Sequence, residues 1–370
     1  MTQPPPALPG MREDEIDTPA LLIDLPAFER NLDRLAGFAA RAGVRLRPHA
    51  KTHKSPDVAL RQMARGAVGV CCQKVSEAEA MVAGGVPDVL VSNEVWGGRK
   101  LARLAALAGR ARIGVCVDDA AQVGPLSAAA VAAGTSIGVL VEIEVGAGRC
   151  GVAPGEAAAA LGRLVAAAPG LRFEGLQAYH GRAQHLRQPA ERKAAIAAAA
   201  EAVGASVAAL KAAGLACATI GGAGTGTFAE EAASGLWNEL QCGSYCFMDA
   251  DYALNQSPDI AFEHALFVLA TVMSRPTAER AVLDAGHKAV SIDAGLPLVW
   301  ERPEATVAGL ADEHCRLLTG ASNDPLALGS RVRLVPGHCD PTVNLHDWYV
   351  GVRDGVVECV WPVAARGALA

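Results

Sequence analysis

Most of the chain alternates between short, continuous apolar runs and alanine-rich stretches with a helical period. Runs such as residues 137–141, with the sequence IGVLV, are typical of strands buried on both faces of a parallel sheet. Eight such strands are predicted, at 45–51, 67–72, 88–92, 112–117, 137–144, 171–178, 217–221 and 238–242. Helices are predicted between them, at 57–65, 76–84, 99–109, 120–133, 155–168 and 191–213. Eight β–α units favour a closed (β/α)8 barrel over an open, doubly wound sheet.

The pattern changes on both sides of this region. Residues 21–25 predict a strand, and Pro26 predicts the first turn of a helix, where its missing N–H costs nothing. Beyond residue 262 short strands are predicted at 266–272, 281–283, 331–335, 348–352 and 356–361, with a hairpin turn at Asp354-Gly355. We therefore expect an α/β architecture with an N-terminal arm at 1–20, a barrel at 21–262 and a C-terminal, mostly β domain at 263–370. Strand 21–25 is a candidate to cross over and join the β domain.

Composition excludes several classes of function. The net charge is −6 and no basic tract is present, which argues against a nucleic-acid partner. The ten cysteines form no CxxC pair, the proline-rich start has no apolar signal core, and no apolar run reaches the ~20 residues that span a bilayer. We expect a cytoplasmic protein with reduced thiols and no membrane partner.

The stretch 47–54, RPHAKTHK, covers the end of the first predicted barrel strand, which Lys51 closes, and barrel enzymes place their chemistry at these strand ends. Burial lowers the proton affinity of a lysine, and the amine of such a lysine can form a Schiff base with a carbonyl. Lys51 is therefore a candidate catalytic residue, with His49 on its face and His53 following if the chain stays extended. A solvated basic loop is the alternative interpretation of the same residues.

Two loops after the last barrel strands predict a phosphate site. Residues 221–227, GGAGTGT, offer converging backbone N–H groups and hydroxyls, and residues 241–245, QCGSY, offer a second set of donors. Glycine-rich turns are common, but phosphate sites of barrel enzymes often use this pair of loops. Together they indicate a phosphorylated cofactor.

Three further positions carry candidate chemistry. Arg149 lies in a glycine-rich loop after the fifth strand, where it could approach a ligand or simply hold a loop carbonyl. His185 follows the sixth strand and is a candidate general base, although a lone histidine is usually structural. In the segment PGHCDPT, an extended chain would place His338 and Asp340 on one side and Cys339 on the other, as a metal pair with open positions. A turn with a hydrogen-bonded Asp is the alternative there.

In combination these motifs resemble the fold-type III pyridoxal-phosphate enzymes, with alanine-racemase-like barrels. The likeness is to the branch that holds D-threonine aldolase, 3-hydroxy-D-aspartate aldolase and eukaryotic-type D-serine dehydratase. It covers nearly the whole chain. The matching stretches are 17–20, 47–54, 70–78, 92–94, 148–152, 176–185, 239–252 and 334–347.

The resemblance implies a set of site residues and a homodimer. Lys51 would carry pyridoxal 5'-phosphate as a Schiff base, and His338 and Asp340 would hold a divalent metal beside it. The other cofactor-binding residues implied are Gln73, Arg149 and Tyr179 around the cofactor, and Gly222, Gly224, Thr225, Ser244 and Tyr245 at its phosphate.

The metal motif separates the branches. Dehydratases that resemble this chain usually show His-x-Cys, which suits zinc, whereas aldolases show His-x-Asp, which suits magnesium or manganese. The spacing here selects Asp340 and therefore Mg²⁺ or Mn²⁺ rather than Zn²⁺, although Cys339 stands between the two ligands. His185 also matches the aldolase pattern.

The resemblance therefore implies an aldolase, a carbon–carbon lyase that cleaves β-hydroxy-D-amino acids. Similarity around 8–11 and 340–353 favours 3-hydroxy-D-aspartate, giving glycine and glyoxylate, whereas His180 is closer to the D-threonine enzyme, which gives acetaldehyde. The cation for a distal carboxylate stays open among Arg182, His53, His287 and Lys288. A D-serine or 3-hydroxyaspartate dehydratase, a racemase and a non-catalytic cofactor carrier are the rival functions.

Overall fold

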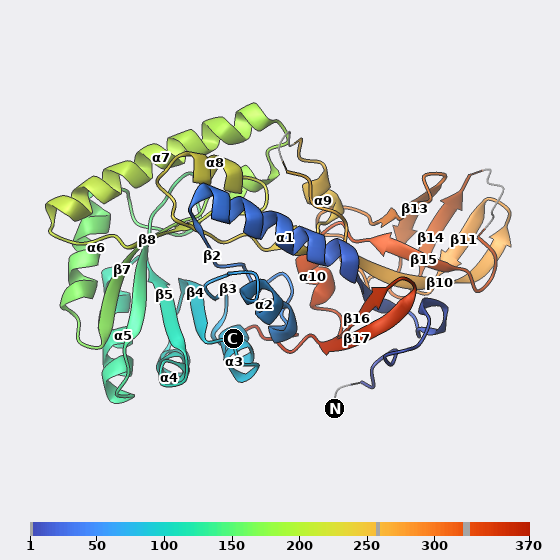
Figure 1. Cartoon of the computed structure of the whole chain (residues 1–370), viewed down its shortest axis with the longest axis horizontal. Helices are drawn as coiled ribbons and strands as arrows, with labels where there is room; N and C mark the ends of the chain where they lie inside the picture. The colour runs from blue at the N-terminus through green and yellow to red at the C-terminus, as the bar shows by residue number, and fades with distance from the viewer. Residues whose placement is uncertain (1–2, 257–259, 321–325) are drawn as a thin grey trace.

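The computed structural model describes residues 3–256, 260–320 and 326–370, which form a β–α barrel and a sheet-rich domain (Figure 1). The barrel fills one end of the molecule and the antiparallel strands fill the other. Helix α1 (Leu25–Ala42) lies across both parts in this view. The predicted architecture, an alanine-racemase-like barrel followed by a mostly β domain, is confirmed.

The barrel is a sheet of eight parallel strands in the order β2-β9-β8-β7-β6-β5-β4-β3, so every predicted strand is present. The strands are β2 (Arg45–Leu46), β3 (Val70–Cys72), β4 (Asp88–Glu94), β5 (Arg112–Val117), β6 (Ile137–Glu142), β7 (Leu171–Ala178), β8 (Thr219–Gly222) and β9 (Glu239–Leu240). Backbone hydrogen bonds close the barrel beyond β2, from Ala50 N to Cys71 O (2.7 Å) and from Cys71 N to Pro48 O (2.9 Å). This closure holds the backbone next to Lys51 in place.

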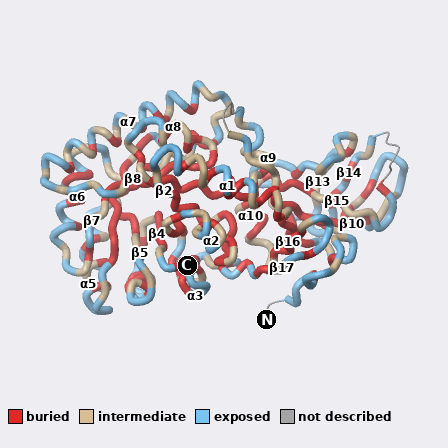
Figure 2. Tube along the Cα trace, viewed as in Figure 1, coloured by how far each residue is buried: buried red, intermediate tan, exposed pale blue. Residues whose placement is uncertain are grey.

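Helices cover the outside of the barrel where the alanine-rich stretches predicted them. They are α2 (Pro56–Met63), α3 (Val75–Ala83), α4 (Gly98–Leu107), α5 (Ala120–Ala132), α6 (Glu156–Ala167) and α7 (Pro189–Ala212). Glycines in the left-handed conformation follow α5 and α7, Gly134 at φ +63° and Gly214 at φ +72°, as expected of C-terminal caps. Figure 2 shows that the strands inside this ring are buried and that the outer faces of the helices are exposed.

The described part of the second domain forms a sheet of nine strands, six of which the sequence pattern predicted. They are β1 (Ala20–Asp24), β10 (Leu266–Thr277), β11 (Arg280–Leu283), β12 (Leu298–Val299), β13 (Ala305–Leu310), β14 (Cys315–Thr319), β15 (Arg331–Val335), β16 (Trp348–Arg353) and β17 (Val356–Pro362). Strand β1 pairs with β10 and β16, so the early strand does cross over. The predicted hairpin is also present, with Asp354 at φ +51° and Gly355 at φ +76° between β16 and β17.

The described part of the N-terminal arm packs against this sheet. Gly10 N donates to Val357 O (2.8 Å), and Ile16 is completely buried. The arm is therefore more ordered than its proline-rich composition indicates. The domain boundaries given above stay predictions.

We expected no apolar stretch long enough to span a bilayer, but helix α7 is such a stretch. By length and composition it could cross a membrane, and it is the one such helix among the described residues. It contacts α6 and α8 (Phe228–Ala233) along the barrel, and one-third of its most apolar window is buried in the protein. Its alanines supply most of the hydropathy, and a helix that covers a barrel shows the same composition.

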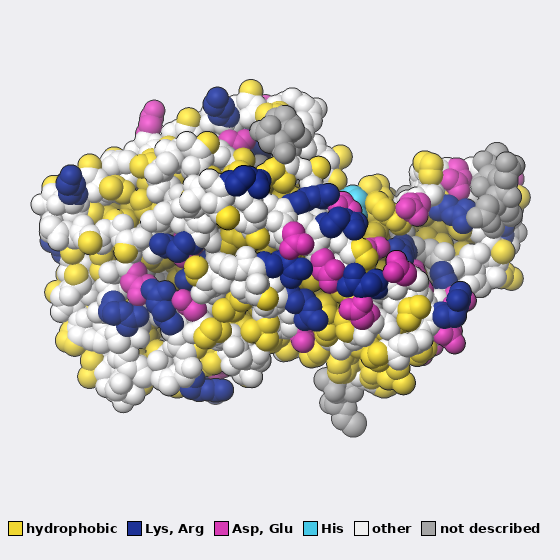
Figure 3. All heavy atoms as spheres, in the orientation of Figure 1, with side chains coloured by type: hydrophobic (Ala, Val, Ile, Leu, Met, Phe, Trp, Pro, Cys, Tyr) yellow, Lys and Arg dark blue, Asp and Glu magenta, His cyan; other side chains and the backbone are white. Residues whose placement is uncertain are grey.

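Charged side chains on the face shown in Figure 3 are mixed in sign, with basic and acidic groups side by side over α1. Arg30 pairs there with Glu263 at 2.6 Å, and Arg65 pairs with Asp33 at 2.6 Å. This face has no extended basic field.

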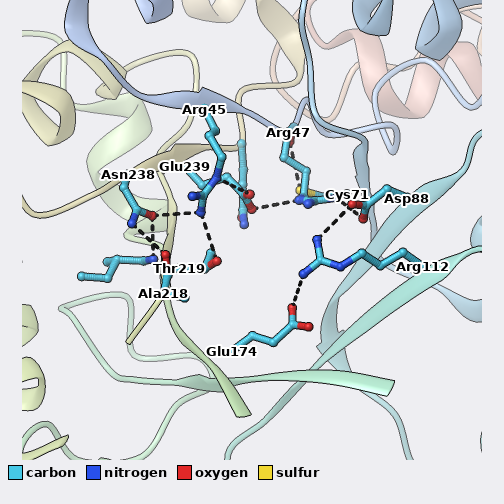
Figure 4. Close-up of polar contacts among 12 residues, drawn as sticks. Arg45, Arg47, Cys71, Asp88, Arg112, Glu174, Ala218, Thr219, Asn238 and Glu239 are labelled. Carbon is cyan, nitrogen blue, oxygen red and sulfur yellow. Dashed lines mark hydrogen bonds and ion pairs between the residues drawn. The ribbon is translucent and has the colours of Figure 1, made fainter. Parts of the chain in front are cut away.

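A network of alternating charges, buried around Arg47 and Glu239, lies at the amino-terminal end of the barrel strands (Figure 4). Arg47 lies at its centre and donates to Glu239 (2.8 Å) and to Asp88 (2.7 Å). Arg112 continues the network from Asp88 (3.0 Å) to Glu174 (2.8 Å). Asp88, Arg112 and Glu239 each begin a strand, so the network lies at the floor of the barrel.

Candidate active site

Lys51 lies in a turn directly after the first barrel strand, and its side chain points toward the second domain. The Nζ atom is 2.5 Å from Oδ2 of Asp340. Burial disfavours the charged amine, yet the charge of Asp340 raises the pKa of Lys51 above its ordinary value. The chain does not stay extended: Lys54 N bonds Ala50 O (2.7 Å), and His53 turns into the interior and is completely buried.

A pocket surrounds Lys51 at the mouth of the barrel and gathers most of the predicted cofactor residues. Predicted residues in its wall are Lys51, Gln73, Arg149, Tyr179, Gly224, Thr225 and Ser244. Gly222 and Tyr245 do not line it. Gly222 lies within β8, where a side chain would meet Ala178 O, and the Tyr245 ring packs against Phe262 in the core.

Several other residues of this wall were not predicted individually, although Ala223, Gln241 and Gly243 lie in the two predicted phosphate loops. These wall residues are Thr52, Ser92, Gln177, Ala223, Gln241, Gly243 and Tyr252. His49, noted only as a neighbour of Lys51, also lines the pocket and lies 3.0 Å from Gln73 Nε2. Burial lowers the pKa of His49 well below its usual range, so the ring is neutral. Polar residues at the ends of apolar strands, such as Gln177 in β7, were the signal that could have identified this set.

The loops that follow β8 and β9 form a cradle that fits a phosphate. Thr225 and Ser244 are more than 90% buried and lie in the pocket wall. The Thr225 hydroxyl accepts from Tyr245 N (3.0 Å), which leaves its proton free for a ligand oxygen. A Cβ at Gly224 would lie 2.3 Å from Gln184 Oε1, so the backbone approaches its neighbours as only glycine allows.

Arg149 reaches the pocket from a loop that Glu144 holds. The Glu144 carboxylate accepts from the backbone N–H groups of Gly146 (2.5 Å), Gly148 (2.8 Å) and Arg149 (3.3 Å). The guanidinium lies 5.4 Å over the Tyr179 ring and 3.6 Å from Glu142. Because Glu144 already holds this loop, Arg149 is not required for that role and its guanidinium is available to a ligand.

His338 and Asp340 lie close together as predicted, but in a helical turn and not in an extended segment. An extended segment was the condition considered for this pair, but helix α10 (Cys339–Val343) begins directly after His338. The helical turn brings His338 Nε2 to 3.9 Å from Asp340 Oδ1 and turns Cys339 into the core, where it is completely buried. The donor pair is thus imidazole and carboxylate.

These two side chains fit a divalent cation. Burial alone would raise the pKa of Asp340, but the charges of Lys51 and His338 outweigh it and lower the pKa to about 2. Asp340 Oδ1 is buried and has no hydrogen-bond partner among the described residues. His338 Nδ1 bonds Asp293 Oδ2 (2.8 Å), which leaves Nε2 available as a ligand.

His185 lies at the end of η2 (Gly181–His185), and about half of its side chain is exposed. Its Nδ1 is 2.6 Å from Asp251 Oδ2. The ring does not line the pocket directly. It lies 5.4 Å from the ring of Tyr252, which does.

A second group of potential metal ligands was not predicted. One ligand atom from each of Glu94, Asp118 and Cys150 lies within 4.8 Å of the others. The group lies at the ends of β4 and β5, beside the loop of Arg149, and Gly151 N donates to Asp118 (3.0 Å). Polar residues directly after apolar strands were again the available signal.

The structure places the four candidate cations for a distal carboxylate at different positions relative to the pocket. His53 is completely buried and lies outside the pocket wall. Lys288 bonds Glu313 at 2.6 Å, and His287 beside it is exposed on the β domain. Arg182 approaches the loop of Arg149, since a Cβ at Gly148 would lie 3.4 Å from its Nη2.

Comparison with known proteins agrees with this geometry. Residues 23–251 match the alanine racemase N-terminal domain, and residues 265–352 match the putative serine dehydratase domain. The 3-hydroxy-D-aspartate aldolase of Paracoccus denitrificans is 50% identical over 98% of this chain and 95% of its own. The D-threonine aldolase of an Arthrobacter species is 49% identical over 98% of this chain and 96% of its own.

Solved structures give the same result. The crystal structure of D-threonine aldolase from Filomicrobium marinum is 54% identical, covers 99% of this chain and 100% of its own, and superposes with a TM-score of 0.97. The D-threo-3-hydroxyaspartate dehydratase of a Delftia species is more distant, at 30% identity over 93% of this chain and 96% of its own. The chain therefore belongs to the alanine racemase N-terminal family, in the branch that contains the 3-hydroxy-D-aspartate and D-threonine aldolases.

Proposed function

We propose that this protein is a pyridoxal 5'-phosphate- and divalent-metal-dependent aldolase that cleaves the Cα–Cβ bond of β-hydroxy-D-amino acids. The observation that carries the proposal is the contact between the Lys51 amine of the barrel and the Asp340 carboxylate of the metal pair. It supports a single site in which a cofactor-binding lysine and a metal act on one substrate. The proposed metal is Mg²⁺ or Mn²⁺, since Asp340 rather than the buried Cys339 faces the lysine.

The residues that line the pocket support a site for the cofactor. Lys51 would supply the amine that holds the cofactor carbonyl, and Gly224, Thr225 and Ser244 would hold its phosphate. Gln73, Arg149 and Tyr179, which also line the pocket, would contact the rest of the cofactor. Once bound, pyridoxal phosphate supplies an electron sink for the pair released when Cα–Cβ breaks.

The metal pair and the base act on the substrate's β-hydroxyl. A divalent ion on His338 and Asp340 would lower the pKa of that hydroxyl. His185 accepts the hydroxyl proton, directly or through a water. Loss of this proton turns the β-carbon into the carbonyl of the leaving aldehyde, and a proton added at Cα completes glycine.

We propose 3-hydroxy-D-aspartate as the preferred substrate, with D-threonine as a second substrate. Arg182 is the candidate cation for the distal carboxylate, because it approaches the Arg149 loop at the edge of the pocket. Glyoxylate would leave from 3-hydroxy-D-aspartate and acetaldehyde from D-threonine.

A product assay tests the function. Purified protein with pyridoxal phosphate and Mg²⁺ or Mn²⁺ is given 3-hydroxy-D-aspartate and then D-threonine, with and without a chelator. Glycine and an aldehyde in equal amounts, lost with the chelator, are the expected result. Ammonia and a keto acid instead would establish the dehydratase, and turnover that survives chelation with inverted Cα would establish a racemase.

A homodimer in the cytoplasm completes the proposal. All ten cysteines are free thiols, as a reducing compartment requires. Analytical ultracentrifugation tests the dimer, and fractionation of the producing cells tests the location.

A further inference from the structure

The imidazole of His185 is held by a carboxylate that has its own anchors. Asp251 Oδ2 lies 2.6 Å from His185 Nδ1, while the other oxygen, Oδ1, accepts from Arg187 Nη2. The second guanidinium nitrogen of Arg187 donates to the backbone oxygen of Asp251 (2.8 Å) and to Asn255 Oδ1 (2.7 Å). Asp251 is mostly buried, so its carboxylate is shielded from solvent although about half of the His185 side chain is exposed.

The same short segment is bonded to the metal loop of the other domain. Asp251 N donates to Gly337 O (3.2 Å), one residue before the proposed ligand His338. Two residues earlier, the fully buried Asp249 accepts from Cys339 N (3.1 Å). Residues 249–251 therefore connect the proposed base with the loop that carries the metal pair.

The contact also determines which nitrogen of His185 carries the proton. An ionised carboxylate only accepts hydrogen bonds, so the Nδ1 atom that faces Asp251 must be the donor. In a neutral imidazole the other nitrogen, Nε2, is then the acceptor. Among the described residues, Nε2 has no hydrogen-bond partner, so its lone pair is available to a substrate proton.

We propose that Asp251 is a positioning residue of the aldol cleavage. It holds His185 as the Nδ1–H tautomer with Nε2 toward the substrate hydroxyl. It also fixes the position of this ring relative to the metal loop. The proposal rests on the proposed function only in taking His185 as the base that receives the hydroxyl proton.

Asp251→Asn reverses this arrangement with almost no change of shape. Arg187 can only donate, so the asparagine must present its carbonyl oxygen to Arg187 and its NH₂ group to His185. Nδ1 then becomes the acceptor, Nε2 carries the proton, and His185 can no longer accept from the substrate. A carboxylate-to-amide exchange beside a catalytic histidine acts in this way in serine proteases.

Kinetics on the holoenzyme give the first test. We expect Asp251→Asn to lower kcat by about 10²-fold or more while KM and the affinity for pyridoxal phosphate change little. The double variant Asp251→Asn/His185→Gln should be no slower than His185→Gln alone, because Asp251 acts through that ring. Asp33→Asn, in an exposed ion pair with Arg65, is the matched control and should match the wild type. A kcat within about threefold of wild type for Asp251→Asn, or losses that multiply in the double variant, would overturn the proposal.

A second measurement does not depend on turnover. Nitrogen-15 NMR of histidine-labelled protein at alkaline pH, with His185→Gln to assign the signal, reports the tautomer of His185. Protonated Nδ1 is the expected result, and protonated Nε2 would overturn the proposal even if Asp251→Asn did not fold. If the protein cleaves no β-hydroxy-D-amino acid, the proposed function fails while the tautomer still tests the role of Asp251.

Discussion

Lys51 Nζ and Asp340 Oδ2 lie 2.5 Å apart, although the two residues are separated by 289 positions and belong to the barrel and the β domain. Strand β1, which precedes the barrel in sequence, pairs with β10 and β16 in the second sheet and so connects the two domains. The site is therefore assembled from both domains, and each contributes a different part of the chemistry: the cofactor amine from one and the metal ligands from the other.

Replacing Lys51 should abolish covalent attachment of the cofactor while the protein still folds. We expect Lys51→Ala to retain its thermal stability within a few degrees, to lose the absorbance band of covalently bound pyridoxal phosphate, and to lose turnover by about 10³-fold or more. Lys211→Ala, on the outer helix α7, is the control. Turnover at the wild-type rate in Lys51→Ala would contradict the proposed role of this amine.

Asp293 should tune the affinity of the metal site. It bonds His338 Nδ1 at 2.8 Å and so directs Nε2 toward Asp340. Because partners of this kind orient metal-bound imidazoles, Asp293→Ala should weaken Mn²⁺ binding by about 10- to 100-fold, measured by titration of the apo protein. Asp312→Ala, on the surface of the same domain, should leave the affinity unchanged. Equal affinities in the two variants would show that Asp293 does not orient His338 for metal binding.

Gly224 should be intolerant of a side chain. A Cβ there would lie 2.3 Å from Gln184 Oε1, and Gln184 cannot move away without losing its bonds to Gly226 N (3.0 Å) and Thr227 Oγ1 (2.7 Å). The resulting shift of the phosphate loop should weaken pyridoxal phosphate binding by about tenfold or more. Gly204→Ala has open space around it and serves as the control.

The periodic parts of this fold could be predicted from the sequence, because apolar runs and alanine-rich helices carry their own signal. The eight barrel strands and Lys51 at the end of the first are examples. Strands β12 to β14 are short, and half or more of their positions are not buried, so little apolar pattern marks them. The helix at Cys339 was missed because Pro341 follows so closely, although proline is compatible with the first helical turn.

The site was harder to predict where its contacts cross long stretches of sequence. Nothing local to Asp251 indicates that it meets His185, 66 residues earlier, and nothing local to Asp293 indicates that it meets His338. The wall residues Gln177 and Gln241 bond each other at 2.8 Å only because β7 and the end of β9 come together in the barrel. Such pairs depend on the topology, which composition and periodicity do not give.

Glu231 should make the stability of the apo protein depend on pH. It is completely buried in α8 behind the phosphate loop, and burial raises its pKa to about 8. The native state keeps the proton up to that pH, whereas the unfolded chain releases it near pH 4.3, so the free energy of unfolding falls as pH rises. Between about pH 5 and 8 this one group should contribute a slope of about −1.4 kcal/mol per pH unit.

Glu231→Gln removes that slope, since the amide does not titrate. Urea unfolding of both proteins at several pH values measures it, and the variant should become the more stable protein as pH approaches 8. Parallel pH curves for the two proteins would show that Glu231 is ionised in the native state.

The charged floor of the barrel should matter for stability and not for catalysis. Glu239 is almost completely buried and accepts from Arg47, whose side chain is only 6% exposed (Figure 4). Removing one charge from a buried pair leaves the other without compensation, so Glu239→Gln should lower the free energy of unfolding by about 3 kcal/mol. Glu79→Gln breaks the exposed pair with Arg103 and should cost about 1 kcal/mol or less.

The loss of stability in Glu239→Gln should not be accompanied by a loss of catalysis. Glu239 begins β9 and Lys51 follows the end of β2, so the floor and the mouth lie at opposite ends of the barrel. For Glu239→Gln we expect kcat and KM per folded molecule to match the wild type at a temperature where both proteins are folded. A specific activity that fell together with stability would mean that the floor also sets the positions of the strand ends at the mouth. The network would then be part of the site's framework and not only of the barrel's closure.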